Sequence, residues 1–300
     1  MRARDVLGAM GIAAGAAAGV AAGACALVAP RRSDEGLEER WAEVCRYRYA
    51  HRGLHAEGIP ENSFAAFAKA RELGFGVELD VHLTLDGELV VIHDSNLGRV
   101  CGRSGVVEQL TLSELGECRL MGTDEGIPTL DEALRLFDTS GDAASPAPPV
   151  IVELKTADGN APLLAERTMA CIDCYDLRFC VESFDPRVLG WLRARRPDVL
   201  RGQLVRSFLD DRDLSLARRL GATALLGNVT ARPDFIACRF RDRGLPAVRL
   251  ACGRLGAHLV TWTIHSEREM LESEAEGAPV IFEGFIPDPR STIGGEGRPD

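Results

Sequence analysis

Apolar and polar positions follow two alternating periods along residues 46–282. Short apolar runs, typical of buried strands, are separated by stretches with apolar residues every three or four positions, typical of amphipathic helices. Strands are predicted at 46–50, 76–82, 150–155, 178–184, 200–205, 235–238, 258–264 and 279–282. Helices are predicted at 61–73, 130–137, 163–175, 186–195, 213–220, 247–255 and 267–274. This alternation without an internal repeat predicts an α/β fold, a parallel (β/α)8 TIM barrel.

One connection departs from that alternation. Asp86 and Gly87 predict a hairpin turn into a short strand at 88–92. Residues 95–127 then predict an irregular insertion with one helix around 112–115. The chain has 300 residues, and about 255 remain after the first segment, which suits one barrel. We therefore predict an N-terminal anchor and linker at 1–45 and a barrel domain at 46–290.

The N-terminal segment is the most apolar part of the chain. Residues 6–30 contain no charged side chain, which is enough to cross a bilayer as one helix. We predict a single N-terminal transmembrane helix before the barrel and a membrane localisation with the barrel in the cytoplasm. Arginines flank the segment on both sides, so the positive-inside rule does not decide its orientation. The alternative is a cleaved signal peptide.

Charge and cysteine content narrow the class of partner. The formal net charge is −10, and the barrel region has no basic run, which argues against nucleic acid as a partner. The nine cysteines are scattered rather than grouped at metal-binding spacing. This pattern favours reduced thiols and a reducing compartment.

Paired carboxylates stand on two of the predicted barrel strands. Glu78 and Asp80 are two residues apart, so both point to one face of their strand. Glu153 on the next barrel strand adds a third oxygen donor, and three hard oxygen ligands suit Mg²⁺ or Ca²⁺ better than zinc. His82 continues the same face and is predicted to contact these ligands. The alternative is that Arg52 or Lys155 neutralises the carboxylates as ion pairs.

Two histidines follow predicted strands beside these carboxylates. Phosphodiester cleavage needs one group to take a proton and another to donate one, and imidazoles suit both tasks near neutral pH. We predict His51 and His93 in these roles, with Arg52 and Lys155 offsetting negative charge on the phosphate oxygens. In the same region, Glu61 and Asn62 are interpreted either as residues that cap the following helix or as groups contacting the metal ligands. Likewise, Trp262 either packs in the barrel or forms an apolar wall for the substrate.

The motifs in their order resemble a known family. They are Ala50-His51-Arg52-Gly53, Pro60-Glu61-Asn62, Glu78-Leu79-Asp80-Val81, Asp86-Gly87, His93-Asp94, Glu153-Leu154-Lys155, Ser183-Phe184 and Trp262-Thr263. Over most of residues 48–285 the chain resembles the glycerophosphodiester phosphodiesterases of the phospholipase C-like phosphodiesterase superfamily. The resemblance implies a divalent metal, hydrolysis to an alcohol and glycerol 3-phosphate, and a lipid-derived or small-molecule phosphodiester substrate. By position, His51 and His93 match the family's acid/base pair, Glu78, Asp80 and Glu153 its metal ligands, and Arg52 and Lys155 its phosphate-binding cations.

Two positions depart from the family pattern. His265 stands where the family usually has asparagine, and residues 282–289 replace a Thr-Asp-x-Pro-like ending. Three alternatives therefore stay open beside hydrolysis to glycerol 3-phosphate. They are a phospholipase C-like enzyme that forms a cyclic phosphate, a lysophospholipase D-like enzyme, and a noncatalytic protein that binds phosphate esters.

Overall fold

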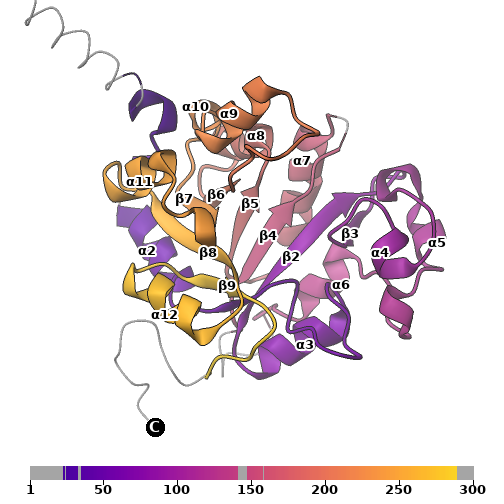
Figure 1. The fold of residues 1–300 in the computed structure, drawn as a ribbon. Coiled ribbons are helices and arrows are strands. Elements are labelled where there is room, and N and C mark those ends of the chain that lie inside the picture. Colours follow the sequence, from indigo (N-terminus) through magenta and orange to yellow (C-terminus); the bar gives the residue numbers. More distant parts are fainter. Residues whose placement is uncertain (1–22, 24, 33–34, 141–146, 158, 289–300) are drawn as a thin grey trace, which may run out of the picture.

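The computed structural model describes residues 23, 25–32, 35–140, 147–157 and 159–288. The strands in this part of the chain form one sheet in the order β1-β9-β8-β7-β6-β5-β4-β2-β3, and β1 also pairs with β2, which closes a barrel (Figure 1). They are β1 (Tyr49–Ala50), β2 (Gly76–Leu83), β3 (Leu89–Val91), β4 (Val150–Leu154), β5 (Phe179–Ser183), β6 (Arg201–Val205), β7 (Phe235–Arg239), β8 (His258–Ile264) and β9 (Val280–Phe282). All neighbouring barrel strands pair in parallel. The predicted parallel barrel of eight strands is therefore confirmed.

Helices surround the barrel on its outside (Figure 1). Those described are α2 (Glu35–Val44), α3 (Phe64–Glu72), α4 (Gly98–Cys101), α5 (Leu112–Leu115), α6 (Leu130–Arg135), α7 (Ala161–Ile172), α8 (Pro186–Arg195), α9 (Leu216–Thr223), α10 (Asn228–Ala231), α11 (Pro246–Gly253) and α12 (Glu267–Ala275). Local capping sets several starts. The Ser63 side chain accepts from the Ala66 amide and begins α3, and Ser215 does the same for α9 through Arg218. Both helices consequently start three residues later than the periodicity predicts.

The predicted hairpin and insertion form a small unit on one side of the barrel. Strand β3 pairs antiparallel with β2, and Gly87 supplies the positive φ of 84° that the turn requires. Beyond β3, the insertion contains α4 and α5 and packs around its own apolar cluster, which includes Ile92, Leu97 and Leu115. This cluster holds the loop that carries His93 against the barrel.

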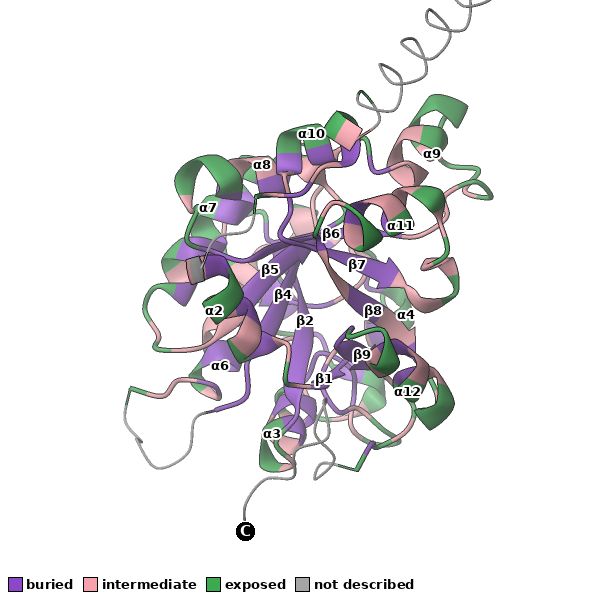
Figure 2. Cartoon of the chain, turned by 90° about the vertical axis from the view of Figure 1, so that its left-hand side faces the viewer, coloured by how far each residue is buried: buried purple, intermediate pink, exposed green. Residues whose placement is uncertain are grey.

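Side chains alternate in direction along each strand and so form two apolar layers, one outside the barrel and one inside it. On β2, Val77, Leu79 and Val81 face outward and pack with helices α3, α6, α7 and α8. The barrel interior at the strand starts is filled by a second cluster that includes Tyr49, Ile151 and Phe235. Figure 2 shows the buried strands at the centre with helices around them. The alternation of period two thus places one residue set in each layer.

Helix α2 packs into the apolar cluster at the base of the barrel interior. Its residues Leu37, Trp41 and Val44 are buried in the same cluster as the strand starts. The Trp41 ring stacks on His258 at 4.3 Å and lies 5.7 Å from the Phe235 ring, measured between centroids. Residues 1–45 were predicted as an N-terminal anchor and linker, and the part that forms α2 packs into the base of the barrel.

The predicted membrane localisation is wrong. No helix within the described ranges is long and apolar enough to cross a bilayer. Residues 1–22 and 24, which hold most of the predicted segment, lie outside the described residues. At the other end of that segment, Val28 is buried among barrel residues, its carbonyl accepts from Asn228 Nδ2 at 3.0 Å, and Arg232 donates to the carbonyl oxygens of Ala26 and Ala29. Residues 26–29 therefore pack on the barrel at α10.

Candidate active site

Four acidic side chains lie in the barrel interior above the apolar layer. Asp80 on β2 is in register with Glu153 on β4, and Glu153 is in register with Glu182 on β5. Glu78 lies one layer below Asp80 on the same face of β2. None of the four is more than 6 % exposed. Because buried carboxylates need compensation, this layer is the first candidate for a functional site.

A cavity of about 160 Å³ opens among these residues at the carboxyl ends of the strands. It is lined by His51, Arg52, Glu78, His93, Glu153, Lys155, Glu182, Phe184, Leu204, Trp262, Thr263 and Ile281. Seven of the residues singled out in the sequence therefore meet at one cavity, which lies where barrel active sites lie. Asp80 is completely buried and does not line the cavity.

Two basic side chains neutralise part of the acidic layer. Lys155 Nζ lies 2.9 Å from Asp80 Oδ1 and 2.7 Å from Glu153 Oε1. The Arg52 backbone amide donates to Glu78 at 3.1 Å, and Arg52 Nε lies 3.6 Å from Asp80 Oδ2. The ion pairs that the sequence offered as the alternative to a metal site therefore form at Asp80 and Glu153. These ion pairs do not reach every carboxylate oxygen of the layer.

The four carboxylates differ in how easily they ionise. Burial alone would raise the pKa of Asp80, but Lys155, His93 and Arg52 outweigh it and hold that pKa well below its usual range. Burial raises the pKa of Glu153 to about 7, and burial together with the neighbouring carboxylates raises the pKa values of Glu78 and Glu182. A cation among Glu78, Glu153 and Glu182 would relieve this repulsion.

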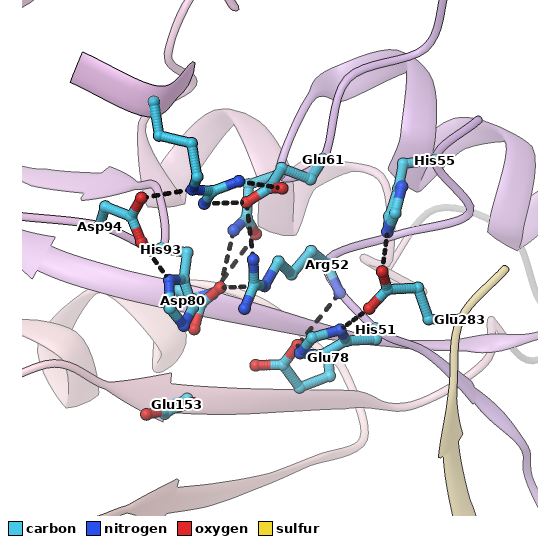
Figure 3. A network of polar contacts seen from close by, with 12 residues as sticks. His51, Arg52, His55, Glu61, Glu78, Asp80, His93, Asp94, Glu153 and Glu283 are labelled. Carbon is cyan, nitrogen blue, oxygen red and sulfur yellow. Dashed lines mark hydrogen bonds and ion pairs between the residues drawn. The ribbon is translucent and has the colours of Figure 1, made fainter. Parts of the chain in front are cut away.

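Each of the two histidines is held by a carboxylate at the same ring nitrogen (Figure 3). His51 Nδ1 lies 2.6 Å from Glu283 Oε2, and His93 Nδ1 lies 2.6 Å from Asp94 Oδ1. A carboxylate at Nδ1 fixes the ring and favours the tautomer with the proton there, so Nε2 is the reactive nitrogen. Burial is the largest cause of the lowered pKa of both imidazoles. Both rings line the cavity.

The sequence reasoning missed Glu283 and Glu182. Glu283 directly follows β9, the last barrel strand, so its place at a strand end was the available signal. Glu182 stands one residue before the Ser183-Phe184 motif, on the same strand. Its position next to Glu153 depends on the register between β4 and β5, which the sequence does not state.

Glu61 and Asn62 contact the site rather than cap a helix. Ser63 is the residue that caps α3. Asn62 Nδ2 instead donates to Asp80 Oδ2 at 2.7 Å, from a backbone with a φ of 53°. Glu61 accepts from Arg52 at 2.8 Å and from Arg99 at 2.7 Å (Figure 3). These contacts position Arg52 and the buried Asp80.

His82 and Trp262 take different places. His82 Nδ1 lies 2.6 Å from Glu108 Oε1, and its Nε2 lies 3.1 Å from the His93 carbonyl oxygen, so it links β2 to the loop that carries His93. Trp262 donates from Nε1 to the Ala237 carbonyl at 2.9 Å and meets Phe184 edge to face at 5.8 Å. The tryptophan therefore combines barrel packing with a wall of the cavity.

The donor set fits a divalent cation. Glu78, Glu153 and Glu182 each present one carboxylate oxygen within 4.8 Å of the others. Among the described residues, the buried Glu78 Oε1 and Glu182 Oε2 have no hydrogen-bond partner, although a buried carboxylate without one is costly. Oxygen donors alone are typical of Mg²⁺ and Ca²⁺ sites.

The nine cysteines are spread over the chain. All nine lie among the described residues and have free thiols. Most are dispersed among the apolar clusters of the barrel, as the sequence indicated.

The comparisons with known proteins all point to one family. The model of the Glycerophosphoryl diester phosphodiesterase family matches residues 51–283. A glycerophosphodiester phosphodiesterase of Caldanaerobacter subterraneus is 31 % identical over 256 residues, which cover 81 % of this chain and 94 % of that protein.

Solved structures agree with this result. The structure of an Oleispira antarctica phosphodiesterase in complex with the product sn-glycerol-3-phosphate has a TM-score of 0.65 at 22 % identity, covering 81 % of this chain and 94 % of that one. At that identity the likeness shows the fold. A glycerophosphodiester phosphodiesterase of Thermotoga maritima has a TM-score of 0.58 at 25 % identity, covering 79 % of this chain and 94 % of its own.

Proposed function

We propose that this chain, which belongs to the glycerophosphoryl diester phosphodiesterase family and is a phosphoric diester hydrolase, cleaves glycerophosphodiesters to an alcohol and glycerol 3-phosphate. The observation that carries the proposal is the pair of carboxylate-held imidazoles, His51 and His93, at one cavity with buried carboxylates and two cations. A protein that only binds phosphate esters has no need of two such imidazoles.

The two histidines divide the proton transfers. One imidazole takes a proton from the attacking water as its oxygen bonds to phosphorus, and the other donates a proton to the alcohol oxygen as its bond to phosphorus breaks. The lowered pKa values of both rings keep a neutral imidazole available as the base near pH 7. Glu283 and Asp94 stabilise whichever ring becomes protonated, because each carboxylate lies against Nδ1.

The phosphate group meets a positive edge of the cavity. Arg52 and Lys155 line it and offset the negative charge that develops on the nonbridging oxygens. Arg52 is oriented by Glu61, and Lys155 is oriented by Asp80 and Glu153. These contacts hold both cations in place before substrate binds, so little reorganisation is needed during the reaction.

A divalent cation completes the site. Glu78, Asp80 and Glu153 are the proposed ligands, and the bound Mg²⁺ or Ca²⁺ supplies further charge stabilisation at the phosphate oxygens. Asp80 already contacts Asn62 and Lys155, but a carboxylate oxygen has more than one lone pair to offer. The proposed wall of Phe184 and Trp262 would face the apolar part of the alcohol.

The test is hydrolysis of a panel of glycerophosphodiesters by the purified chain with Mg²⁺, with Ca²⁺ or with chelator. We expect release of glycerol 3-phosphate with a divalent cation and loss of turnover with chelator. A stable cyclic phosphate in the phosphorus NMR spectrum would favour the phospholipase C-like alternative. If folded protein binds these substrates and turns over none, the noncatalytic alternative is correct. Turnover that chelator leaves unchanged would refute the requirement for a metal.

A further inference from the structure

Glu182 is the one carboxylate of the acidic layer that the proposed chemistry does not yet use. Its side chain points into the barrel from β5, is 1 % exposed and lines the cavity with Glu78 and Glu153. Its Oε2 atom is buried and has no hydrogen-bond partner among the described residues. A buried acidic oxygen that faces a cavity without a donor indicates a ligand that supplies the missing positive charge.

The charges of the layer lead to the same conclusion. Its carboxylates are Glu78, Asp80, Glu153 and Glu182, and the cations that face them are Arg52 and Lys155. When all six are ionised, four negative charges stand against two positive charges. One divalent cation neutralises the excess of two, whereas leaving Glu182 out of the set would leave its charge buried and unmatched.

Asp80 and Glu182 differ in the partners that they already have. Asp80 contacts Asn62 through Oδ2 and Lys155 through Oδ1. Among the described residues, Glu182 Oε2 has no hydrogen-bond partner, and one oxygen of Glu182 lies within 4.8 Å of oxygens from both Glu78 and Glu153. The geometry therefore places Glu182, rather than Asp80, in the compact group of three.

We propose that Glu182 is a ligand of the divalent cation together with Glu78 and Glu153. This inference rests on the metal of the proposed function and extends its ligand set to β5. Asp80, which also holds Lys155 and Asn62 in place, stays in the ligand set. The competing explanation is that Glu182 is a neutral, protonated acid with a purely structural role.

The substitution Glu182→Gln separates the two explanations. Glutamine keeps the size of the side chain and resembles a protonated glutamate, but it has no negative charge. The full chain is stripped of metal and titrated with Ca²⁺ and, separately, with Mg²⁺ by calorimetry, and the rise of Tm with added cation is measured. We expect Glu182→Gln to bind about tenfold more weakly or worse, since a lost ligand costs at least as much as a lost supporting contact.

The controls distinguish the possible failures. Glu166→Gln, at an exposed position on α7, removes one charge far from the cavity and is expected to bind as the unaltered chain does. If the unaltered chain binds the cation and Glu182→Gln binds it within twofold, Glu182 is not a ligand and the proposed function stands. If the unaltered chain binds no divalent cation, this inference and the metal of the proposed function both fail.

A second variant covers loss of folding. If Glu182→Gln lacks the circular dichroism spectrum of the unaltered chain, Glu182→Asp keeps the charge and draws the carboxylate back from Glu78 and Glu153. We expect Glu182→Asp to weaken cation binding as well. An unchanged affinity for the cation would overturn the proposal.

Discussion

On β4 and β5, two layers of the barrel interior that are only two residues apart have opposite chemistry. On β4, Ile151 faces inward at the base and Glu153 faces inward above it; on β5, Cys180 and Glu182 repeat the pattern. Both layers are almost fully buried. The comparison teaches that burial by itself does not decide the role of a position. The role depends on what lies at each end of the barrel.

The lower layer is closed by protein. Helix α2 places Trp41 against Phe235 and His258, and the Tyr49 hydroxyl donates to the Val44 carbonyl at 2.7 Å. These contacts join apolar surfaces or pair a polar atom, so they add stability. The upper layer opens on a cavity, and among the described residues some of its buried carboxylate oxygens have no hydrogen-bond partner, which is costly.

The largest effect should follow from removing an imidazole of the upper layer. We expect His51→Ala or His93→Ala to lower kcat by about 10²–10⁴-fold in a protein that remains folded. The measurement is steady-state hydrolysis of a glycerophosphodiester alongside thermal unfolding. His265→Ala serves as the matched control, because His265 is exposed and does not line the cavity. Full activity in either catalytic-histidine variant would contradict the assignment.

The lower layer should respond in the opposite way. Trp41→Ala removes a ring that is only 8 % exposed, and we expect it to lower the free energy of unfolding by about 3–5 kcal/mol. Activity per folded molecule should change little, because the rings that Trp41 meets, Phe235 and His258, do not line the cavity. Denaturant unfolding and kcat/KM measure the two quantities. Glu43→Ala, on the exposed side of α2, is the control, and a loss of kcat equal to the loss of stability would break the comparison.

Substitution of Glu283, which directly follows β9 and lies against His51, should have a smaller effect on activity. We expect Glu283→Gln to lower kcat on the order of tenfold, because the ring keeps a neutral partner but loses a charged one. The Glu283 carboxylate raises the His51 pKa, so the limb of the pH–rate profile that belongs to His51 should move to lower pH in the variant. A profile that keeps its shape and position would show that Glu283 has only a structural role.

The same carboxylate should also make stability depend on pH. The hydrogen bond from His51 lowers the pKa of Glu283 from 4.5 to about 2. The stabilisation linked to a lowered carboxyl pKa is present above the unfolded value and is lost as the pH falls toward the folded one. The difference in Tm between the unaltered chain and Glu283→Gln should therefore shrink between pH 5 and pH 2.

Much of the fold follows from local pattern. Apolar runs and helical periodicity located every strand of the barrel, with helix ends displaced by a few residues where Ser63 and Ser215 act as caps. The same local rule, that residues two apart share a face of a strand, places Glu78 and Asp80 together. The strand-end rule of barrels then brings His51 and Lys155 to the same cavity.

Contacts between distant segments follow from no such rule. Glu182 stands beside Glu153 only because β4 and β5 pair in one register, and Glu283 reaches His51 only because β9 pairs with β1 and closes the barrel. Packing also decides that α2 fills the base and that residues 26–29 contact α10. The period of a strand is a property of its own backbone and can be read from neighbouring residues. Register and closure depend on the combined packing of all the strands, so only the tertiary structure decides which distant charges meet.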